Sequence, residues 1–409
     1  MNAQIVATTG CLAPAENPVS LFGGLDKMNR IVLHVGPEKC GSSSIQNALS
    51  SGSEKLDEIV HAVKLVPDDV RKLNTDSPAQ EDIARFRQII KGAIAAHPGK
   101  TLVLSHEMMF KMTNVLVHLS NISHEYADEV IVIAYIRRQS DFLISSFSEF
   151  LFRSPKRISE TAEILTDNGI DPSLFWGVER HLIAAILGGW KVGRQLSGHL
   201  YLNWSKSIPK RTAALAPTGA KVSIGVLPRA GFSMPLISDF LSRAGLDPEA
   251  GAEVDRVRNP SFHPSLIEAV VNAIEAGHPM PGPHEANDFF DLINSPEVQT
   301  IGPEAPFVTL LKAHIDTVFE KRNVELAGAL NLPADYFVPD ERIDLPTIRA
   351  EIDREANIRA AIPERLRDRE RASRAALAQM VWAAYQMQSD QENFSTRIKR
   401  FVKTRWGRG

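Results

Sequence analysis

The sequence predicts an α/β fold in three layers, with a central parallel sheet and helices on both of its faces. Short continuous apolar runs alternate with amphipathic segments along the first half of the chain, which is typical of strands joined by helical crossovers. The runs are apolar throughout, so we expect strands that are buried on both faces, as in parallel sheets. With 409 residues, of which 44% are hydrophobic and 23% charged, the chain can bury a large core.

The elements follow one another in the order that such a fold requires. The first strand is predicted over residues 30–35, and a helix over residues 42–49 follows it. Residues 53–77 are a charged stretch without a predicted strand. The elements predicted after it are a helix over 80–96 and strands over 101–105, 129–136 and 221–227.

Helical segments make up most of the remainder, which predicts a large helical addition to the sheet domain. A largely helical block spans residues 159–208 and contains Trp176, Trp190, Tyr201 and Trp204, which at helical spacing are more often core residues than ligand contacts. Further helices are predicted near 308–330 and, as one long helix, over 358–388. The predicted organisation is an extension over 1–28, an α/β domain over 29–335 with an insertion at about 155–210, and a C-terminal segment over 336–409.

The strongest chemical signal is the turn after the first strand, in Arg30-Ile-Val-Leu-His-Val-Gly-Pro-Glu-Lys-Cys-Gly-Ser-Ser-Ser-Ile-Gln46. Backbone N–H groups of such a turn and of the helix N-terminus converge on one point, where the helix dipole adds about half a positive charge. Lys39 supplies a full charge, and Gly36 and Gly41 let an anion approach the backbone. Hydroxyl donors follow at Ser42, Ser43 and Ser44. The turn is therefore predicted to bind phosphate, the alternative being a plain Gly/Ser turn.

The spacing separates this turn from the loop of nucleoside triphosphatases, which reads G-x-x-x-x-G-K-[ST] and places a hydroxyl on magnesium. Gly36 and Gly41 keep that frame, but Ser42 stands where the Lys would be. We therefore expect phosphate binding without a metal. The turn resembles the 5′-phosphosulfate loop of sulfotransferases, whose bacterial members commonly read G-x-x-K-[TC]-G-[ST]-[ST]-x-[IL]-Q. The resemblance implies a P-loop-like fold and 3′-phosphoadenosine-5′-phosphosulfate (PAPS) as the donor. The residues implied to contact PAPS are Gly36, Pro37, Lys39, Cys40, Gly41, Ser42, Ser43 and Ser44.

A second segment resembles the same family, Glu129-Val-Ile-Val-Ile-Ala-Tyr-Ile-Arg-Arg-Gln-Ser-Asp-Phe-Leu-Ile-Ser-Ser-Phe147. In sulfotransferases an Arg at the end of this strand and a Ser eight residues later hold the 3′-phosphate of PAPS. Arg137 and Ser145 have that separation, and Arg138 and Ser146 have it too, so the register stays open by one residue. A guanidinium can clamp a phosphate with two hydrogen bonds, and a Ser adds a neutral donor.

Sulfuryl transfer also needs a base for the acceptor proton. The strand over 101–105 ends in Ser105-His106-Glu107, at the sheet edge where open α/β proteins bind ligands. Bacterial relatives often have Ser-x-Glu here and other branches have a His nearby, so the resemblance implies Glu107 or His106 as general base, with Glu107 preferred. Lys39 is expected to stabilise the charge on the leaving phosphate. Capping of the next helix is the structural alternative for both candidate bases.

Charged residues elsewhere fit the resemblance less well. Glu38 lies beside Lys39, although a carboxylate about 4 Å from a phosphate is unfavourable by roughly 1 kcal/mol in a water-like medium. It can point outward, pair with Lys39 or bind an amine acceptor. Residues 252–262 resemble a family stretch with Asn-x-Ser, from which Arg256 or Arg258 would reach PAPS or the acceptor, although an Arg pair in a turn is more often solvated.

The composition limits which partners and which cellular location are expected. The net charge of -3 gives no global attraction to nucleic acid, and two cysteines, Cys11 and Cys40, make no disulfide framework, so we expect a cytoplasmic protein. No run approaches the ~20 apolar residues of a membrane span, and no secretory signal pattern precedes Arg30. Residues 397–409 carry six basic residues and no acid. Such a tail is compatible with peripheral contact to an anionic membrane, although a solvated end is the simpler interpretation.

These observations predict a sulfotransferase that moves a sulfuryl group from PAPS to a hydroxyl or amine, expected on a carbohydrate or glycolipid, and releases 3′,5′-ADP (PAP). A P-loop kinase for a small molecule is the first alternative, but it would need a Lys after Gly41 and an acidic strand end for a metal. A non-catalytic scaffold that binds PAP or another anion is the second. Neither the acceptor nor the oligomeric state follows from a local pattern.

Overall fold

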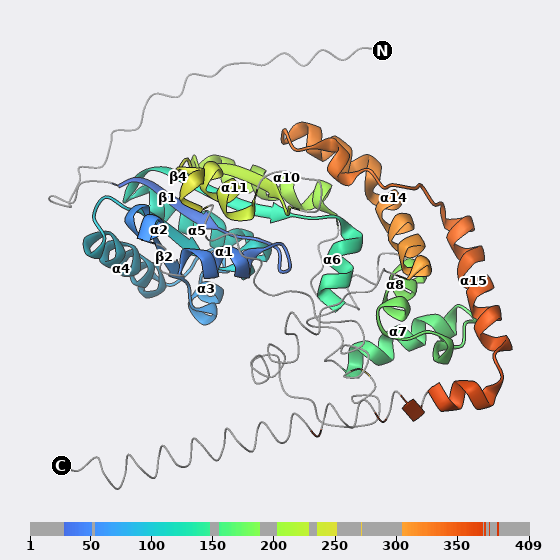
Figure 1. Ribbon diagram of the computed structural model, residues 1–409. Coiled ribbons are helices and arrows are strands. Elements are labelled where there is room, and N and C mark those ends of the chain that lie inside the picture. Colours follow the sequence, from blue (N-terminus) through green and yellow to red (C-terminus); the bar gives the residue numbers. More distant parts are fainter. Residues whose placement is uncertain are drawn as a thin grey trace, which may run out of the picture.

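The computed structural model describes residues 28–50, 54–147, 155–188, 203–228, 235–251 and 305–370, and the single positions 271, 372, 373, 376 and 383. Its centre is a sheet of five parallel strands in the order β2-β3-β1-β4-β5 (Figure 1). The predicted α/β class with a parallel central sheet is therefore confirmed. The strands are β1 (Met28–His34), β2 (Val60–Lys64), β3 (Thr101–Ser105), β4 (Ala127–Ile136) and β5 (Lys221–Val226).

The central strand β1 is buried on both of its faces, as its continuous apolar sequence predicts. Ile31, Val32 and Leu33 are all fully buried. In the register of the sheet, Leu33 lies between Leu104 of β3 and Val132 of β4. The hydrophobic core therefore extends from this strand into both helical layers.

Helices cover the two faces because the crossovers run in two directions. The connection from β1 to β2 runs toward one edge of the sheet, whereas those from β2 to β3, from β3 to β4 and from β4 to β5 run toward the other. Right-handed crossovers in opposite directions lie on opposite faces. Accordingly α1 contacts α11 on one face, and α5 contacts α4 and α10 on the other. The bounds are α1 (Ser42–Leu49), α2 (Glu54–Ile59), α3 (Pro67–Lys72), α4 (Gln80–Ala96), η1 (Glu107–Lys111), α5 (Thr113–His124), α10 (Trp204–Leu215), η4 (Ala216–Thr218), α11 (Leu236–Arg243) and η5 (Pro248–Gly251).

A second group of helices, here called the helical addition, lies beside the sheet domain and includes residues beyond 305, outside the predicted insertion at about 155–210. In Figure 1 it lies to the right of the sheet, and α6 leads into it from the end of β4. The long helix α14 packs against α6, α8 and α10, and α15 packs against α14 and η3. This arrangement brings residues beyond 305 against the helix that begins after the sheet strand β4. The bounds are α6 (Gln139–Ser146), α7 (Pro155–Asp167), η3 (Pro172–Leu174), α8 (Gly177–Leu187), α14 (Pro306–Ala329), η6 (Ala334–Phe337) and α15 (Leu345–Ala361).

Two of the sequence-based expectations are corrected. The charged stretch 53–77 contains strand β2, an edge strand whose side chains are only partly buried, so its sequence lacks the apolar run that marks the other strands. The single helix predicted over 358–388 is wrong, because α15 ends at Ala361 and a new helical segment begins after Pro363. Proline offers no N–H to the preceding turn and disfavours the helical conformation of the residue before it, Ile362, which has φ -62° and ψ 128°.

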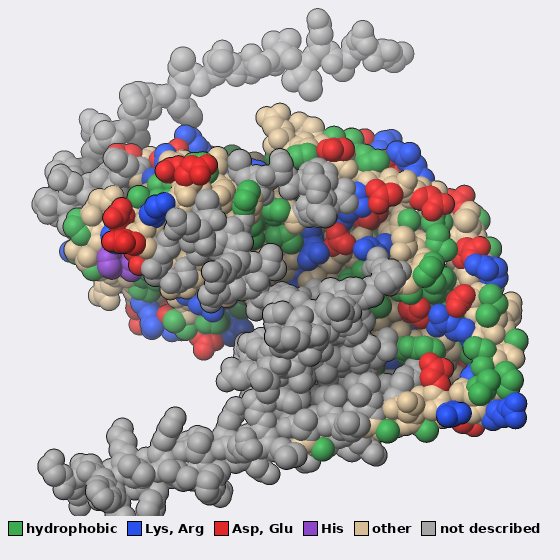
Figure 2. All heavy atoms as spheres, in the orientation of Figure 1, with side chains coloured by type: hydrophobic (Ala, Val, Ile, Leu, Met, Phe, Trp, Pro, Cys, Tyr) green, Lys and Arg blue, Asp and Glu red, His purple; other side chains and the backbone are tan. Residues whose placement is uncertain are grey.

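The surface of the addition is mixed in charge. On the face shown in Figure 2, Lys and Arg side chains are interspersed with Asp and Glu side chains over α15. None of the helices among the described residues has the length and apolar character that crossing a bilayer requires. Several predicted features lie outside the described residues: the extension before Met28, Trp190, Tyr201, Arg256, Arg258 and the basic tail over 397–409.

Candidate functional site

The loop between β1 and α1, residues 35–41, lies at the point where the sheet changes winding direction. β1 is the central strand, and its crossover helix α1 lies on one face while the crossovers that leave the neighbouring strands β3 and β4 lie on the other. Ligands of open α/β sheets bind in the crevice that forms at such a switch point, outside the carboxyl ends of the strands. The fold thus places the predicted phosphate loop where a ligand crevice is expected.

Two residues of this loop have a left-handed backbone conformation. Lys39 has a φ of 67° and Gly41 a φ of 87°. For a residue with a Cβ this conformation costs about 1–2 kcal/mol, and such strain is concentrated at functional sites. Turns that alternate handedness in this way point successive N–H groups toward a common centre. Gly41, the N-cap residue of α1, makes no side-chain cap, and the positive end of the helix dipole lies at the same end of the loop.

A buried hydrogen-bond chain ties the floor of the loop to the neighbouring strand. His34 Nδ1 and Ser105 Oγ, at the ends of β1 and β3, lie 2.8 Å apart. Gln46 of α1 donates its Nε2–H to the same hydroxyl at 3.0 Å. Burial lowers the pKa of His34 to about 4, so its ring is neutral at physiological pH. The chain connects β1, β3 and α1 with neutral groups and fixes where the loop begins and ends.

Two carboxylates flank the loop, and each has a partner. Glu107, the first residue of η1, accepts a hydrogen bond at Oε2 from Ser42 Oγ at 3.0 Å. Lys111, the last residue of η1, forms an ion pair with Glu38 at 2.5 Å. Of the three dispositions considered for Glu38, pairing with Lys39 is wrong, because its partner is Lys111; binding of an amine acceptor stays a prediction. The ion pair offsets the negative charge of Glu38 beside the loop.

The two candidate bases differ in position. Glu107 is in contact with α1, whereas His106 caps η1, accepting the N–H of Met108 at its Nδ1 at 3.0 Å. Burial, helped by Lys64 and Arg71, lowers the pKa of His106. The structural role that the sequence left open for both residues is therefore found for His106, and Glu107 is the one that lies against the loop helix.

Arg137 is brought onto the loop from the end of β4. Its Nη1 donates to the carbonyl oxygen of Lys39 at 3.1 Å, although the two residues are 98 positions apart in the chain. Its own carbonyl accepts the indole N–H of Trp204 at 2.8 Å. The Nε atom is buried and has no hydrogen-bond partner within the described part of the chain. A buried N–H without a partner is costly, so this guanidinium has a hydrogen-bonding capacity that its contacts with the described residues do not use.

The neighbouring Arg138 points elsewhere. Its guanidinium donates to the carbonyl oxygens of Tyr336, at 2.7 Å, and Val338, in and after η6. Ser145 is partly buried in the last turn of α6 and Ser146 is buried there. Arg138 thus contacts η6 whereas Arg137 contacts the loop, and the choice between Ser145 and Ser146 stays a prediction.

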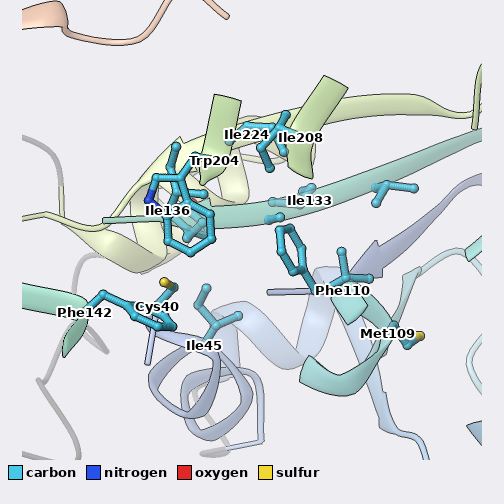
Figure 3. Packing of buried hydrophobic residues seen from close by; sticks show 14 of the residues in the cluster. Cys40, Ile45, Met109, Phe110, Ile133, Ile136, Phe142, Trp204, Ile208 and Ile224 are labelled. Carbon is cyan, nitrogen blue, oxygen red and sulfur yellow. The ribbon is translucent and has the colours of Figure 1, made fainter. Parts of the chain in front are cut away.

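Cys40 faces away from the loop's open side. Its thiol belongs to the buried hydrophobic cluster that also contains Ile45 and Phe142 (Figure 3), and it is 2% exposed. Burial raises the pKa of Cys40 to about 12. The side chain is thus a core residue, and only the backbone of Cys40 remains available to an anion.

The structure brings Arg137 to the backbone of Lys39 and Glu107 to Ser42, so both predicted residues lie against the β1–α1 loop or the first turn of α1. Sequence reasoning missed Lys111 and the role of His34. His34 could have been identified as a polar residue at the end of an apolar strand. Lys111 could have been identified by its place four residues after Glu107, about one helical turn away. Of the predicted aromatic residues, Trp204 is a core residue, fully buried and edge-on to Phe142 at 5.5 Å (Figure 3).

Comparisons with known proteins give no assignment: no protein-family model, no curated protein and no solved structure matches this chain. Within the described residues, no group of three or more His, Cys, Asp or Glu side chains is arranged to hold a metal ion. Functional inference therefore rests on the chemistry of the crevice.

Proposed function

We propose that this protein is a PAPS-dependent sulfotransferase with a P-loop-like core, and that its acceptor is a hydroxyl or amine of a carbohydrate or glycolipid. One observation carries the proposal: the hydrogen bond from Arg137 to the Lys39 carbonyl. It joins the two segments that resemble the 5′-phosphosulfate and 3′-phosphate motifs of that family. The two segments follow the neighbouring parallel strands β1 and β4, and the hydrogen bond between them supports one site to which both contribute.

Different residues are proposed to contact the 5′-phosphosulfate and the 3′-phosphate of PAPS. The N-terminus of α1, the loop N–H groups and Lys39 suit the 5′-phosphosulfate, which is an anion. Arg137, with its unpartnered buried Nε, suits the 3′-phosphate. The Glu38–Lys111 pair keeps the negative charge of Glu38 from opposing the donor.

Glu107 is the proposed base. Ser42 holds one carboxylate oxygen, and the other, Oε1, makes no hydrogen bond to the described residues. In the reaction the acceptor oxygen or nitrogen bonds to sulfur, the bond from sulfur to the 5′-phosphate oxygen breaks, and PAP leaves with that electron pair. The acceptor proton passes to Glu107, while Lys39 stabilises the charge that develops on the leaving phosphate.

Calorimetric titration of the full chain with PAP, 5′-AMP and ATP tests the donor site. We expect PAP to bind more tightly than 5′-AMP, and Arg137→Ala to remove the preference, because only PAP carries the 3′-phosphate. A charge-assisted contact contributes about 1.5–3 kcal/mol, so the loss should be roughly 10- to 150-fold. Arg342→Ala, a change at an exposed arginine paired with Glu320, is the matched control and should leave both affinities unchanged.

Transfer from radiolabelled PAPS to a panel of glycans and amines tests the reaction itself. Turnover of ATP with no PAP preference would favour a small-molecule kinase, and tight PAP binding without transfer to any acceptor would favour a scaffold. Equal loss of PAP and 5′-AMP affinity in Arg137→Ala would remove the assigned role of that residue.

A further inference from the structure

The contact between α6 and α14 is polar and buried, which is uncommon for the packing of two helices. Gln139 and Asn323 exchange two amide hydrogen bonds, of 3.1 and 2.7 Å, and the two side chains are 0% and 3% exposed. Buried polar contacts are stable only when every group is satisfied, so they define one relative position of the two helices. The position of α6, which begins directly after the arginine pair, is therefore set by α14.

Asp316 of α14 caps the N-terminal turn of α6. Its two carboxylate oxygens accept the backbone N–H of Ser140 at 3.2 Å and the hydroxyl of Ser140 at 2.8 Å. The first N–H groups of a helix have no partner within the helix, and a carboxylate there is also favoured by the helix dipole. Burial raises the pKa of Asp316 to about 6, whereas Ser140 and Arg138 oppose that shift.

The same carboxylate holds Arg138. The Nη1 of Arg138 lies 3.6 Å from Asp316 Oδ2, and its other donors bond to the carbonyls of Tyr336 and Val338. Arg138 is 7% exposed and Asp316 5%. The three contacts of this guanidinium thus all lead into the helical addition.

Arg137 immediately precedes these contacts. Its carbonyl is held by Trp204, and the next residue is fixed by Asp316, Tyr336 and Val338. With the backbone fixed on both sides, the Arg137 guanidinium is the part of this strand end that remains directed at the loop, where it meets the Lys39 carbonyl.

We propose that Asp316 is a positioning residue: by holding Arg138 and the first turn of α6 it directs Arg137 toward the β1–α1 loop. The proposal rests on the function proposed above, since it concerns the arginine assigned to the 3′-phosphate. It places a determinant of donor binding in a helix of the addition, outside the sheet domain and far from Arg137 in the sequence.

Asp316→Asn tests this, because asparagine keeps the size and an acceptor for Ser140 but removes the charge that faces Arg138. We expect PAP affinity to fall about tenfold with 5′-AMP affinity within about twofold of the wild type, measured by calorimetry. In the double variant with Arg137→Ala, the Asp316→Asn change should have almost no further effect, because a positioning residue acts only through the group that it positions.

Glu179→Gln is the matched control. Glu179 of α8 also pairs a carboxylate with an arginine of the addition, Arg359 of α15, at 2.7 Å, and neither residue belongs to α6 or α14. Thermal unfolding of both variants checks folding, and the control should lower stability without changing the ratio of PAP to 5′-AMP affinity. The same ratio change in both variants would overturn the proposal, because it would show a general effect of destabilising the addition.

Amide hydrogen exchange of residues 38–42 gives a readout that needs no ligand. We expect these amides to exchange about tenfold faster in Asp316→Asn than in Glu179→Gln. Wild-type protein that does not distinguish PAP from 5′-AMP would refute the proposed donor, whereas unchanged exchange and an unchanged affinity ratio in Asp316→Asn would refute the positioning role alone.

Discussion

Replacing Gly41 by alanine tests whether the β1–α1 loop has the conformation described here. Gly41 has a φ of 87°, in the left-handed region, which costs a residue with a Cβ about 1–2 kcal/mol. An added Cβ would also lie 2.8 Å from the terminal methyl carbons Cδ1 of Leu227 and Cδ2 of Leu236. These methyl groups can turn aside, so the clash adds about 1 kcal/mol, at the lower end of the usual range for overpacking. Gly41→Ala should therefore destabilise the protein by about 2–3 kcal/mol.

Urea unfolding followed by circular dichroism measures this loss. With a dependence of about 3 kcal/mol per molar urea, the upper end of the typical range and suited to a long chain, the midpoint should fall by roughly 0.7–1 M. Gly36→Ala is the matched control in the same loop, because its φ is not positive and an added Cβ would meet no atom within 4 Å. Alanine there restricts the unfolded chain, so stability should be unchanged or rise by about 0.4–1 kcal/mol.

The same two variants probe the ligand site. The space that the Gly36 Cβ would occupy is open, so a bound donor that uses it would be displaced and PAP affinity should fall in Gly36→Ala while folding stays intact. If Gly41→Ala were as stable as the wild type, or Gly36→Ala equally destabilised, the loop conformation inferred here would be wrong.

Three further outcomes follow from the geometry. Glu107→Gln should slow transfer about 10²–10⁴-fold with PAP affinity little changed. His106→Ala should lower the free energy of unfolding by about 1 kcal/mol through the lost cap and leave the transfer rate near normal. A larger rate loss in His106→Ala than in Glu107→Gln would reverse the assignment of the base. Lys111→Ala should weaken PAP binding roughly fivefold, about 1 kcal/mol, because Glu38 is left unpaired beside the loop. Adding Glu38→Gln to this variant should restore PAP affinity. If affinity were not restored, Lys111 would act on the ligand directly. Burial raises the pKa of Cys40 from 9.0 to about 12, so the unfolded thiol ionises first and stability should fall as pH rises from about 9 toward 12. Cys40→Ser should flatten that slope in urea unfolding measured across the range, and an unchanged slope would contradict the burial of this thiol.

The sequence by itself determined the local structure near the loop. Helices over 42–49 and 80–96 and the strand over 101–105 have the predicted bounds, because continuous apolar runs and helical periodicity are properties of adjacent residues. The order of these elements also favoured a parallel sheet, since parallel strands need a crossover connection, which is usually a helix. The edge strand β2 was missed for the converse reason: its partly exposed side chains give no such run.

Only the tertiary structure decided how the charged residues are used. Arg137 and Arg138 are adjacent and chemically identical, and the sequence left their register open. They differ because one meets the Lys39 carbonyl and the other the α14 carboxylate of Asp316, nearly 180 positions away. Likewise, Glu38 is paired with Lys111 and not with its neighbour Lys39, which depends on how η1 lies against the loop. These pairings depend on packing between elements that are distant in the chain, so they cannot be predicted from the periodicity of adjacent residues.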